Sequence, residues 1–425
     1  MPSPRPPYDV VVVGLGLAGL TAALAAASRG ARVLALGKGY GTTHFRSGTI
    51  DVLGYLEGGA VRSPRPALSA LAAARPEHPY ARLGGRVEEA LSFLRDAARG
   101  GGVELQGGLD EAQLVATTAG TLRPTCLAPT SLLGAWDGAR VLAVGLQGFR
   151  DFDPELFAAT LPPVAARLGL EVAVRPARLS LAPLLRRHLD GLGLARLLDR
   201  PAFRHQLAEA LRPLARGCTL VALPAVLGLE AATAAALATE LGPAVELPTL
   251  PPSVPGIRLQ RALERALRER GGRVQVGAEV RLECAAGRAR ALELEAAGRR
   301  LRMPLRSVVL ATGGMASGGL RLEPSGAVVE PAADLPVAQP PGPPGRWFRE
   351  RFLGSCDQAI DLAGVRADAC MRPLDAEGRV VIENLFVAGG LLAGAERSLE
   401  RSADGIACAS GYVAGLEAAA VEATA

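Results

Sequence analysis

The sequence predicts an α/β protein in which a doubly wound domain is interrupted by a second α/β unit, and three observations support this prediction. A β-branched run near the amino terminus leads into a glycine-rich turn and an alanine-rich helix. Two further apolar runs near the carboxyl terminus each lead into a pair of glycines. Between these pieces, predicted strands alternate with predicted helices, which is typical of a mostly parallel sheet.

The first unit of the chain is a strand, turn, helix and strand within about thirty residues. Val10–Val13 suits a strand that is buried on both faces. An alanine-rich helix is predicted over residues 18–28, with Gly30 as its C-cap, and a second strand over residues 32–36. This is the complete context of a dinucleotide-binding unit and not only its motif.

Three glycines in the turn have separate physical roles. Gly14 permits the tight bend, Gly16 lets the backbone approach a phosphate, and Gly19 lets the helix pack closely on the strand. The N-terminus of the helix offers unpaired N–H groups and a positive dipole to an anion. The spacing therefore predicts a phosphate-binding site at residues 14–19.

The same stretch has an alternative interpretation. Residues 10–28 are nineteen consecutive uncharged positions, which is typical of a signal peptide or a transmembrane helix. Asp9 and the glycine spacing argue against both, because a membrane helix has no use for that spacing. We therefore expect no transmembrane segment in this chain.

Two patterns near the carboxyl terminus indicate which nucleotide is bound. Ser307–Leu310 is an apolar strand followed by a threonine and two glycines, and a second strand over residues 382–387 is followed by another glycine pair. This order resembles flavoproteins of the glutathione reductase and fumarate reductase groups, whose flavin-binding domain is assembled from discontinuous pieces. It favours a flavin over NAD(P), and the residues expected along the flavin are Thr312, Gly313, Gly314, Gly389 and Gly390.

One residue of the usual dinucleotide site is missing. An acidic residue normally ends the second strand and binds the ribose hydroxyls. Here Gly37 and Lys38 occupy that place, and Lys38 becomes a candidate cofactor contact. The cofactor is then either FAD held in a different way or a ligand that lacks the adenosine half.

The middle of the chain predicts the second α/β unit. We expect strands at residues 140–144, 171–174, 219–223 and 244–247 and helices at residues 154–168, 201–215 and 230–241. The predicted domains are residues 1–110 with 250–425, and an inserted cap of residues 111–249, with a substrate cleft between them. The helix that follows carries Arg258 at its start, where a solvent-exposed position is favoured over an anion-binding one.

Charge and cysteine usage exclude several functions. The net charge of +5 is dispersed and only 4% of residues are aromatic, so a nucleic-acid surface is not expected. The six cysteines are far apart and never form CxxC, which argues against an iron–sulfur or zinc site and predicts no metal. They are typical of reduced, buried thiols in a cytosolic protein.

The loop of residues 42–51 follows the second strand, where ligands bind in this kind of fold. His44 is a candidate proton-transfer group, and Ser47 and Gly48 are candidates to contact the flavin. A structural loop histidine is the competing interpretation of His44. His78 is a second, weaker candidate.

Five stretches together resemble one family, the B subunit of the anaerobic, quinone-linked sn-glycerol-3-phosphate dehydrogenase. The most specific of them is PTLPPSVPGIRLQ, and the match runs in order across essentially the whole chain. The stretches are residues 44–56, 77–84, 247–260, 313–320 and 383–394.

The resemblance implies a flavin subunit of a three-part complex, with FMN as the cofactor and FAD as the alternative that the glycine turn favours. The A subunit of that complex would be the catalytic partner, and a membrane-associated iron–sulfur C subunit would pass electrons from sn-glycerol 3-phosphate to quinone. The chain would then be cytoplasmic and peripherally held at the inner face of the cell membrane. Because no convincing base and phosphate-binding arginine set is found here, substrate oxidation is expected in the partner.

Two other functions are compatible with the residues. One is a stand-alone FAD-dependent oxidoreductase that acts on another small molecule. The other is a non-catalytic flavin-binding subunit. The sequence also departs from the family at residues 395–405, which are charged where a glycine-rich turn is usual, so the redox tuning of the flavin is in doubt there.

Overall fold

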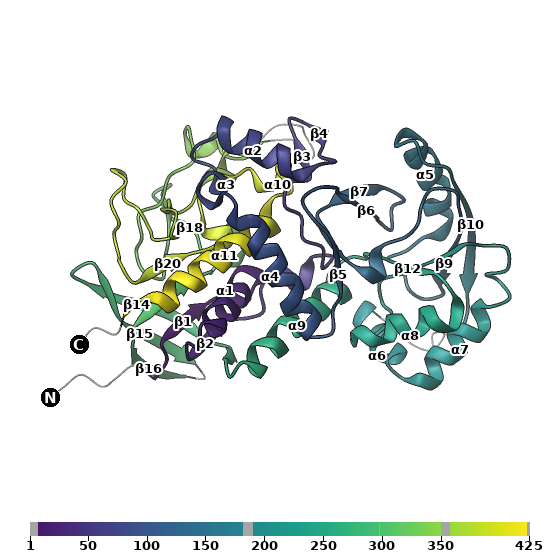
Figure 1. The fold of residues 1–425 in the computed structure, drawn as a ribbon, viewed down its shortest axis with the longest axis horizontal. Helices are drawn as coiled ribbons and strands as arrows, with labels where there is room; N and C mark the ends of the chain where they lie inside the picture. Colours follow the sequence, from purple (N-terminus) through teal and green to yellow (C-terminus); the bar gives the residue numbers. More distant parts are fainter. Residues whose placement is uncertain (1–6, 182–189, 297, 350–357, 423–425) are drawn as a thin grey trace.

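The computed structural model describes residues 7–181, 190–296, 298–349 and 358–422. Two lobes are visible along the long axis of the molecule (Figure 1). Each lobe is built on its own parallel sheet and has a large hydrophobic core of its own. The predicted doubly wound α/β fold is confirmed, whereas the domain boundaries at 110 and 250 stay a prediction.

The sheet of the first lobe is assembled from distant parts of the chain. Its five parallel strands run in the order β13-β2-β1-β17-β20. All residues of β1 and β17 are buried, as the apolar runs predict. The strands are β1 (Val10–Val13), β2 (Val33–Gly37), β13 (Arg273–Val276), β17 (Ser307–Leu310) and β20 (Leu385–Val387).

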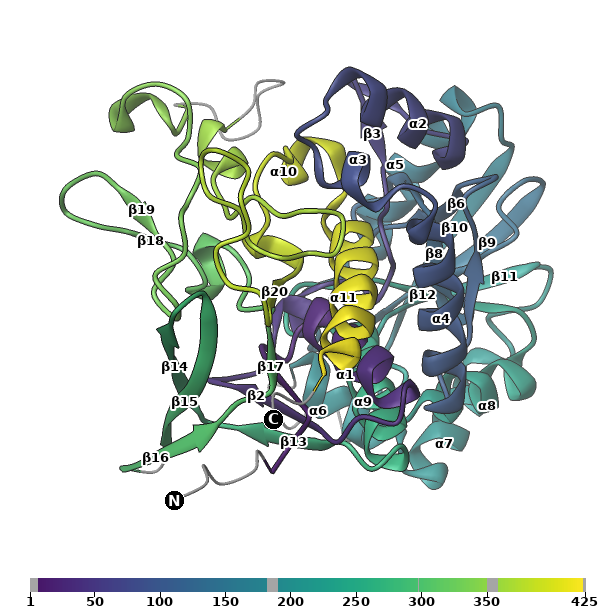
Figure 2. The ribbon, with the colours of Figure 1, turned by 60° about the vertical axis from the view of Figure 1, so that its left-hand side comes forward.

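Four helices pack against one another on one side of this sheet: α1 (Leu17–Ser28), α4 (Arg86–Gly100), α9 (Val254–Glu269) and α11 (Ala403–Ala420). An antiparallel sheet of three strands lies on the other side (Figure 2). Its strands were not predicted, because their exposed faces are dominated by arginine and glutamate. They are β14 (Glu279–Ala285), β15 (Arg288–Ala296) and β16 (Arg299–Pro304).

The second lobe contains four parallel strands in the order β10-β9-β11-β12. The predicted alternation of strands and helices is confirmed, but β10 continues to Leu179 where the prediction ended at residue 174. The strands are β9 (Ala139–Leu146), β10 (Val172–Leu179), β11 (Leu220–Pro224) and β12 (Ala244–Leu247), and the helices are α5 (Pro154–Arg167), α6 (Gly191–Leu198), α7 (Pro201–Leu211) and α8 (Ala231–Leu241).

Short elements complete both lobes. They are β3 (Tyr55–Leu56), β4 (Gly59–Ala60), α2 (Pro64–Ala74), α3 (Pro79–Leu83), β5 (Leu105–Gly107), β6 (Gln113–Ala116), β7 (Leu122–Thr125), β8 (Leu127–Pro129), β18 (Arg321–Leu322), β19 (Val328–Val329) and α10 (Arg397–Glu400). Over the described ranges, no helix combines the length and the apolar character that crossing a membrane requires.

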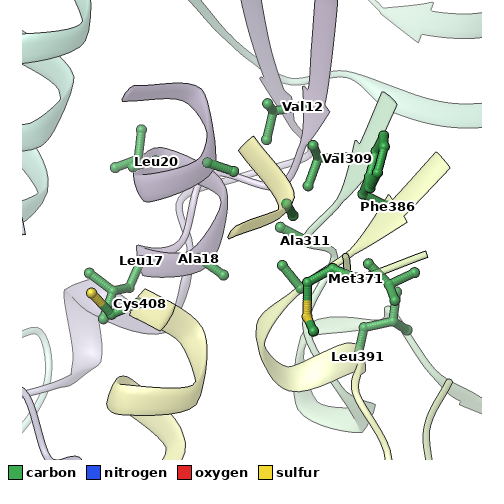
Figure 3. Close-up of a cluster of buried hydrophobic side chains, with 14 of the residues drawn as sticks. Val12, Leu17, Ala18, Leu20, Val309, Ala311, Met371, Phe386, Leu391 and Cys408 are labelled. Atoms are coloured by element: carbon green, nitrogen blue, oxygen red, sulfur yellow. The ribbon is translucent and has the colours of Figure 1, made fainter. Parts of the chain in front are cut away.

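Helices α1 and α11 touch through their backbones. A Cβ atom built on Gly411 would lie 2.3 Å from the carbonyl oxygen of Ala18, and one built on Gly415 would lie 2.2 Å from that of Ala22. Figure 3 shows Ala18 and Leu17 at the start of α1 beside Cys408 of α11, next to the ends of the central strands. The close approach of the two helices therefore requires small residues, alanine and glycine, along their contact.

A buried ion pair joins the start of α9 to the second lobe. Arg258 is 6% exposed, and its guanidinium donates to both carboxylate oxygens of Glu246, at 2.5 and 2.9 Å, and to the carbonyl of Gly228. The Leu227 N–H also donates to Glu246, at 3.1 Å. The expectation of a solvent-exposed Arg258 is therefore wrong, because its partner lies in the inserted unit.

Asp9 holds the amino-terminal ends of three neighbouring strands together. Its carboxylate accepts hydrogen bonds from the Arg32 guanidinium, both at 3.0 Å, and lies 3.4 Å from Arg306. The hydrogen bond from Arg32 outweighs partial burial and lowers the Asp9 pKa to about 2. Asp9, whose charge is untypical of a signal peptide, thus has a structural role.

The contact between α1 and α11 predicts the effect of Gly411→Ala. We expect the free energy of unfolding to fall by about 1–3 kcal/mol, because the added methyl group forces the two helix backbones apart. Urea denaturation measures the change. Gly100→Ala is the matched control: that glycine ends α4 with no atom within 4 Å of its Cβ position, so stability should stay the same or rise slightly. Equal stability of the two variants would contradict the packing argument.

The Asp9 clamp predicts a stability difference that depends on pH. The carboxyl pKa is about 2 in the folded chain against 3.8 for the free group, so its stabilisation is complete above about pH 4 and disappears as the pH falls through 2. We expect Asp9→Asn to lose about 1 kcal/mol at neutral pH, since the partner arginines are partly exposed. Thermal denaturation between pH 7 and pH 3 should show the gap narrowing at the acid end. A gap that widens with acidification would refute this assignment.

Candidate functional site

The glycine turn after β1 is shaped by two close backbone contacts. Gly14 has φ +123°, and a Cβ atom built on it would lie 2.1 Å from the carbonyl oxygen of Ala311. A Cβ on Gly19 would lie 1.9 Å from the carbonyl oxygen of Gly14. Both positions therefore require glycine: Gly14 for its conformation and its contact with the end of β17, Gly19 for the packing of α1.

The two glycine pairs from the carboxyl-terminal part of the chain meet at the same place. A Cβ on Gly390 would lie 2.9 Å from the Gly314 nitrogen, and one on Gly389 would lie 2.7 Å from the Ala18 Cβ at the start of α1. The Gly389 N–H donates to the Ser410 hydroxyl of α11, at 2.9 Å. The structure therefore brings together the predicted residues Gly14, Gly16, Gly19, Gly313, Gly314, Gly389 and Gly390.

The start of α1 fits an anionic ligand. Its N-cap is Gly16, which has extended backbone, and no side chain in the described part of the chain caps the helix. The first N–H groups and the positive end of the dipole are thus available to a phosphate. The Gln260 amide donates to the Leu15 carbonyl at 2.8 Å and supports the turn from α9. The donors present here fit the phosphate of a flavin nucleotide.

Two polar residues near the turn differ in their surroundings. The Thr312 hydroxyl is buried and has no hydrogen-bond partner within the described structure, and Gly319 packs over it. Lys38 points away: its side chain is 79% exposed and its ammonium lies 3.3 Å from Glu279 on the surface. Its ammonium therefore lies in a surface ion pair and not among the converged glycine turns.

The second strand ends against the turn. A Cβ on Gly37 would lie 2.8 Å from the Leu15 side chain, and one on Gly41 would lie 2.2 Å from the Gly16 Cα. The backbone of Gly41 is thus packed on the second glycine of the turn. The place where an acid usually binds ribose is taken up by backbone and by Leu15.

His44 lies in a short 3-10 helix, η1 (Thr42–Phe45), that packs on the start of α9. Its ring stacks on Tyr40 at a centroid distance of 4.5 Å, and its carbonyl accepts the Ser253 N–H at 2.7 Å. Burial is the main cause of a lowered His44 pKa, with Arg261 lowering it further and Glu264 opposing. At neutral pH the imidazole is therefore uncharged and able to accept a proton; its role in proton transfer stays a prediction.

Ser47 belongs to a polar network that reaches the second lobe. Its hydroxyl accepts from Arg123 of β7 at 2.7 Å and pairs with Thr49 at 2.8 Å. The second terminal nitrogen of Arg123, Nη1, donates to both carboxylate oxygens of Asp51, at 3.0 and 2.9 Å. The Thr125 hydroxyl donates to the same carboxylate. This loop is thus held rigidly by charge-assisted hydrogen bonds, and Ser47 takes part in them.

Gly48 has a packing role. It has φ +77°, and a Cβ on it would lie 2.9 Å from the Pro255 carbonyl oxygen in α9. From the opposite direction, a Cβ on Gly256 would lie 2.1 Å from the Thr43 carbonyl oxygen. The loop that carries His44 and Ser47 is therefore fixed on α9 by backbone contacts.

A second ion pair beside this loop was not predicted from the sequence. Arg46 donates to Asp404, in the first turn of α11, at 2.9 Å. Burial raises the Asp404 pKa; Arg46 opposes this shift and the Asp51 charge adds to it. The only signal in the sequence was the unusual charge of residues 395–405, which supply Asp404.

His78 is completely enclosed. The Tyr80 N–H donates to its Nδ1 at 3.1 Å, so Nε2 carries the proton and donates to Glu400 at 3.1 Å. Arg75 reaches Glu396 and Glu400 at 2.6 and 3.1 Å. The ring is fully buried in this network, which gives His78 a structural role; a catalytic role stays a prediction.

The described residues include no group of three or more histidine, cysteine or acidic side chains that could hold a metal. The five described cysteines are free; Cys126 and Cys408 are buried, as predicted, but Cys284 is exposed. Cys356 lies outside the described residues.

Comparisons with known proteins identify a flavin-binding family. The FAD binding domain family matches residues 9–403. The B subunit of the anaerobic glycerol-3-phosphate dehydrogenase of Yersinia pestis bv. Antiqua (strain Antiqua) is 34% identical over 406 residues, which cover 91% of this chain and 92% of that protein. The protein of the same name from Vibrio cholerae serotype O1 (strain ATCC 39541 / Classical Ogawa 395 / O395) is 33% identical over 420 residues, or 95% of each chain.

Among solved structures, 3-ketosteroid delta1-dehydrogenase from Sterolibacterium denitrificans is similar over 98% of this chain and 100% of its own. The TM-score is 0.48 and the sequence identity 14%.

The open space at Gly16 predicts that Gly16→Ala separates folding from flavin binding. The added methyl would meet only the Gly41 Cα at 3.7 Å, an ordinary contact, so the flavin-free protein should keep its melting temperature. Flavin affinity should fall about tenfold or more, because the methyl displaces the phosphate from charged hydrogen bonds. Fluorescence titration of stripped protein measures flavin affinity, and a melting curve measures folding. Gly39→Ala, with no atom within 4 Å, is the control and should bind normally. Normal flavin binding by Gly16→Ala would contradict a phosphate site at this turn.

Proposed function

The chain belongs to the FAD binding domain family and to the B-subunit family of the anaerobic glycerol-3-phosphate dehydrogenases, and from this membership we propose a specific function. It is the flavin-carrying subunit of a complex that oxidises sn-glycerol 3-phosphate to dihydroxyacetone phosphate. The secondary alcohol loses a hydroxyl proton and a hydride, and a flavin supplies the chemistry that accepts the hydride.

The observation that carries this proposal is the convergence of three separate glycine turns at the uncapped N-terminus of α1. At Gly16, the N-cap, a built Cβ atom would have only the Gly41 Cα within 4 Å and no side chain, which suits the approach of a phosphate-bearing cofactor.

The electrons need an acceptor outside this chain. In the described residues, cysteine, histidine and acidic side chains nowhere gather in a group that could ligate a cluster. A partner with iron–sulfur centres, the C subunit of the complex, would therefore take the electrons to quinone, and the complex would hold this chain at the cytoplasmic face of the cell membrane. The naming of the relatives as one subunit of an enzyme supports an assembly of this kind.

The substrate alcohol is best oxidised in the catalytic partner, the A subunit of the complex. The two arginines beside the loop of residues 46–51 are each paired with a carboxylate, Arg46 with Asp404 and Arg123 with Asp51. In both cases a carboxylate of this chain therefore competes with the phosphate of the substrate. His44 is retained as a proton-transfer group for the flavin of this chain, because it is half-buried and uncharged at neutral pH.

The proposed flavin is FMN, with FAD as the alternative that the domain family favours. FMN has one phosphate and no adenosine ribose, in keeping with the missing acid after β2.

Mass spectrometry of the flavin released from purified protein tests this proposal. We expect FMN, and we expect that sn-glycerol 3-phosphate bleaches its absorption only when the catalytic partner is added, whereas dithionite reduces it in either case. Release of FAD would overturn the choice of FMN but would leave the proposed function as a flavin-carrying subunit intact. Protein that takes up no flavin would refute the whole assignment, and substrate reduction without a partner would indicate a stand-alone oxidoreductase.

A further inference from the structure

A cavity of about 510 Å³ lies on the face of α9 that points away from the glycine turn. Its walls are the segment of residues 101–104 that follows α4, the start of η2 (Thr130–Leu132), helix α8 and helix α9. The Gln260 side chain, on the other face of α9, reaches the turn itself. The cavity is therefore separate from the proposed flavin site and falls in the size range of small-molecule sites.

The wall of the cavity opposite α9 is apolar and made of small side chains. Helix α8 contributes alanines along its length, and Leu227, Leu229 and Val103 extend the apolar surface. Such a wall offers room and apolar contact but no hydrogen bonds. The alanines are Ala231, Ala232, Ala234, Ala235 and Ala238.

Two arginines stand at the mouth of the cavity with unused donors. Arg261 and Arg265 follow one another on one face of α9, and each has one nitrogen 3.8 Å from a carboxylate oxygen of the same residue, Glu230. That distance is beyond a hydrogen bond, and neither guanidinium hydrogen-bonds to any residue within the described ranges. In Arg258, in contrast, all three guanidinium nitrogens donate hydrogen bonds, two to Glu246 and one to Gly228.

We propose that this cavity binds an amphipathic anion, with a carboxylate or phosphate head between Arg261 and Arg265 and an apolar body along the alanines of α8. Two guanidinium groups one helical turn apart match the two oxygens of such a head. Glu230 is a weak competitor, because its side chain is 61% exposed and makes no hydrogen bond to either arginine.

Isothermal titration of the full chain with decanoate tests the proposal. We expect one molecule bound per chain with a negative heat-capacity change, because the tail leaves water. Decanol has the tail without the charge and acetate has the charge without the tail, so both should bind at least about tenfold more weakly.

Variants assign the binding to this cavity. Arg261→Gln with Arg265→Gln should weaken decanoate binding about tenfold or more, whereas Glu230→Gln should tighten it by removing the competitor. Arg300→Gln, at a residue whose side chain is 85% exposed in β16, is the matched control and should change nothing. Ala235→Phe should abolish binding by filling the cavity. Melting curves confirm that each variant is folded, and flavin content is a separate readout that should stay constant.

The source of the anion is decided by a second experiment. If the chain floats with phosphatidylglycerol vesicles, and decanoate or the double arginine variant abolishes this flotation, the anion is a lipid. If the chain binds decanoate but does not float with the vesicles, the anion is a free amphiphile. The proposal is overturned if no probe binds, if decanol binds as well as decanoate, or if the double variant binds normally. Displacement of decanoate only by an acidic peptide that binds far more tightly would also overturn it, in favour of a docking surface.

Discussion

Backbone-to-backbone contact between α1 and its surroundings is the constraint on which the rest of the structure depends. Gly411 and Gly415 let α11 approach the carbonyls of Ala18 and Ala22, and Gly19 lets α1 rest on the turn that precedes it. These contacts hold the start of α1 beside the ends of β17 and β20 (Figure 3). A side chain at Gly411 or Gly415 would push apart two helices that lie hundreds of residues apart in sequence, and one at Gly19 would push α1 away from its own turn.

The same constraint decides where polar groups are placed. Because the core around this sheet is packed with leucine, alanine and valine, the ion pairs that link its parts lie at the edge of the sheet and at the joint between the lobes. Asp9 ties the strands at their amino-terminal ends, and the Arg258–Glu246 pair ties α9 to the inserted unit. At the carboxyl ends of the strands the glycine turns expose backbone, and a phosphate-bearing ligand can approach there.

The parts that could be predicted from sequence are those in which one residue type is required at a fixed place. Gly14 and Gly19 are such positions, and so are the buried runs of β1 and β17. The side-chain networks could not be predicted, since Arg123 lies 72 residues from Asp51 and Arg46 lies 358 from Asp404. Arg258 was misjudged for a different reason: Glu246 is only 12 residues away in sequence, but the sequence does not show that the start of α9 packs against β12 of the second lobe. Strands β14–β16 were missed because exposed strands lack the apolar runs that mark buried ones.

Helix α9 is the element that connects these regions. Its N-terminal turn supports the loop of His44 through Ser253 and Gly256, its inner face supports the Leu15 carbonyl through Gln260, and Arg258 anchors it in the second lobe. A displacement of α9 would therefore move the glycine turn and the histidine loop together. Since Arg261 also faces the cavity and lowers the His44 pKa through its charge, the polar face of α9 and the histidine loop are joined by electrostatics as well as by packing.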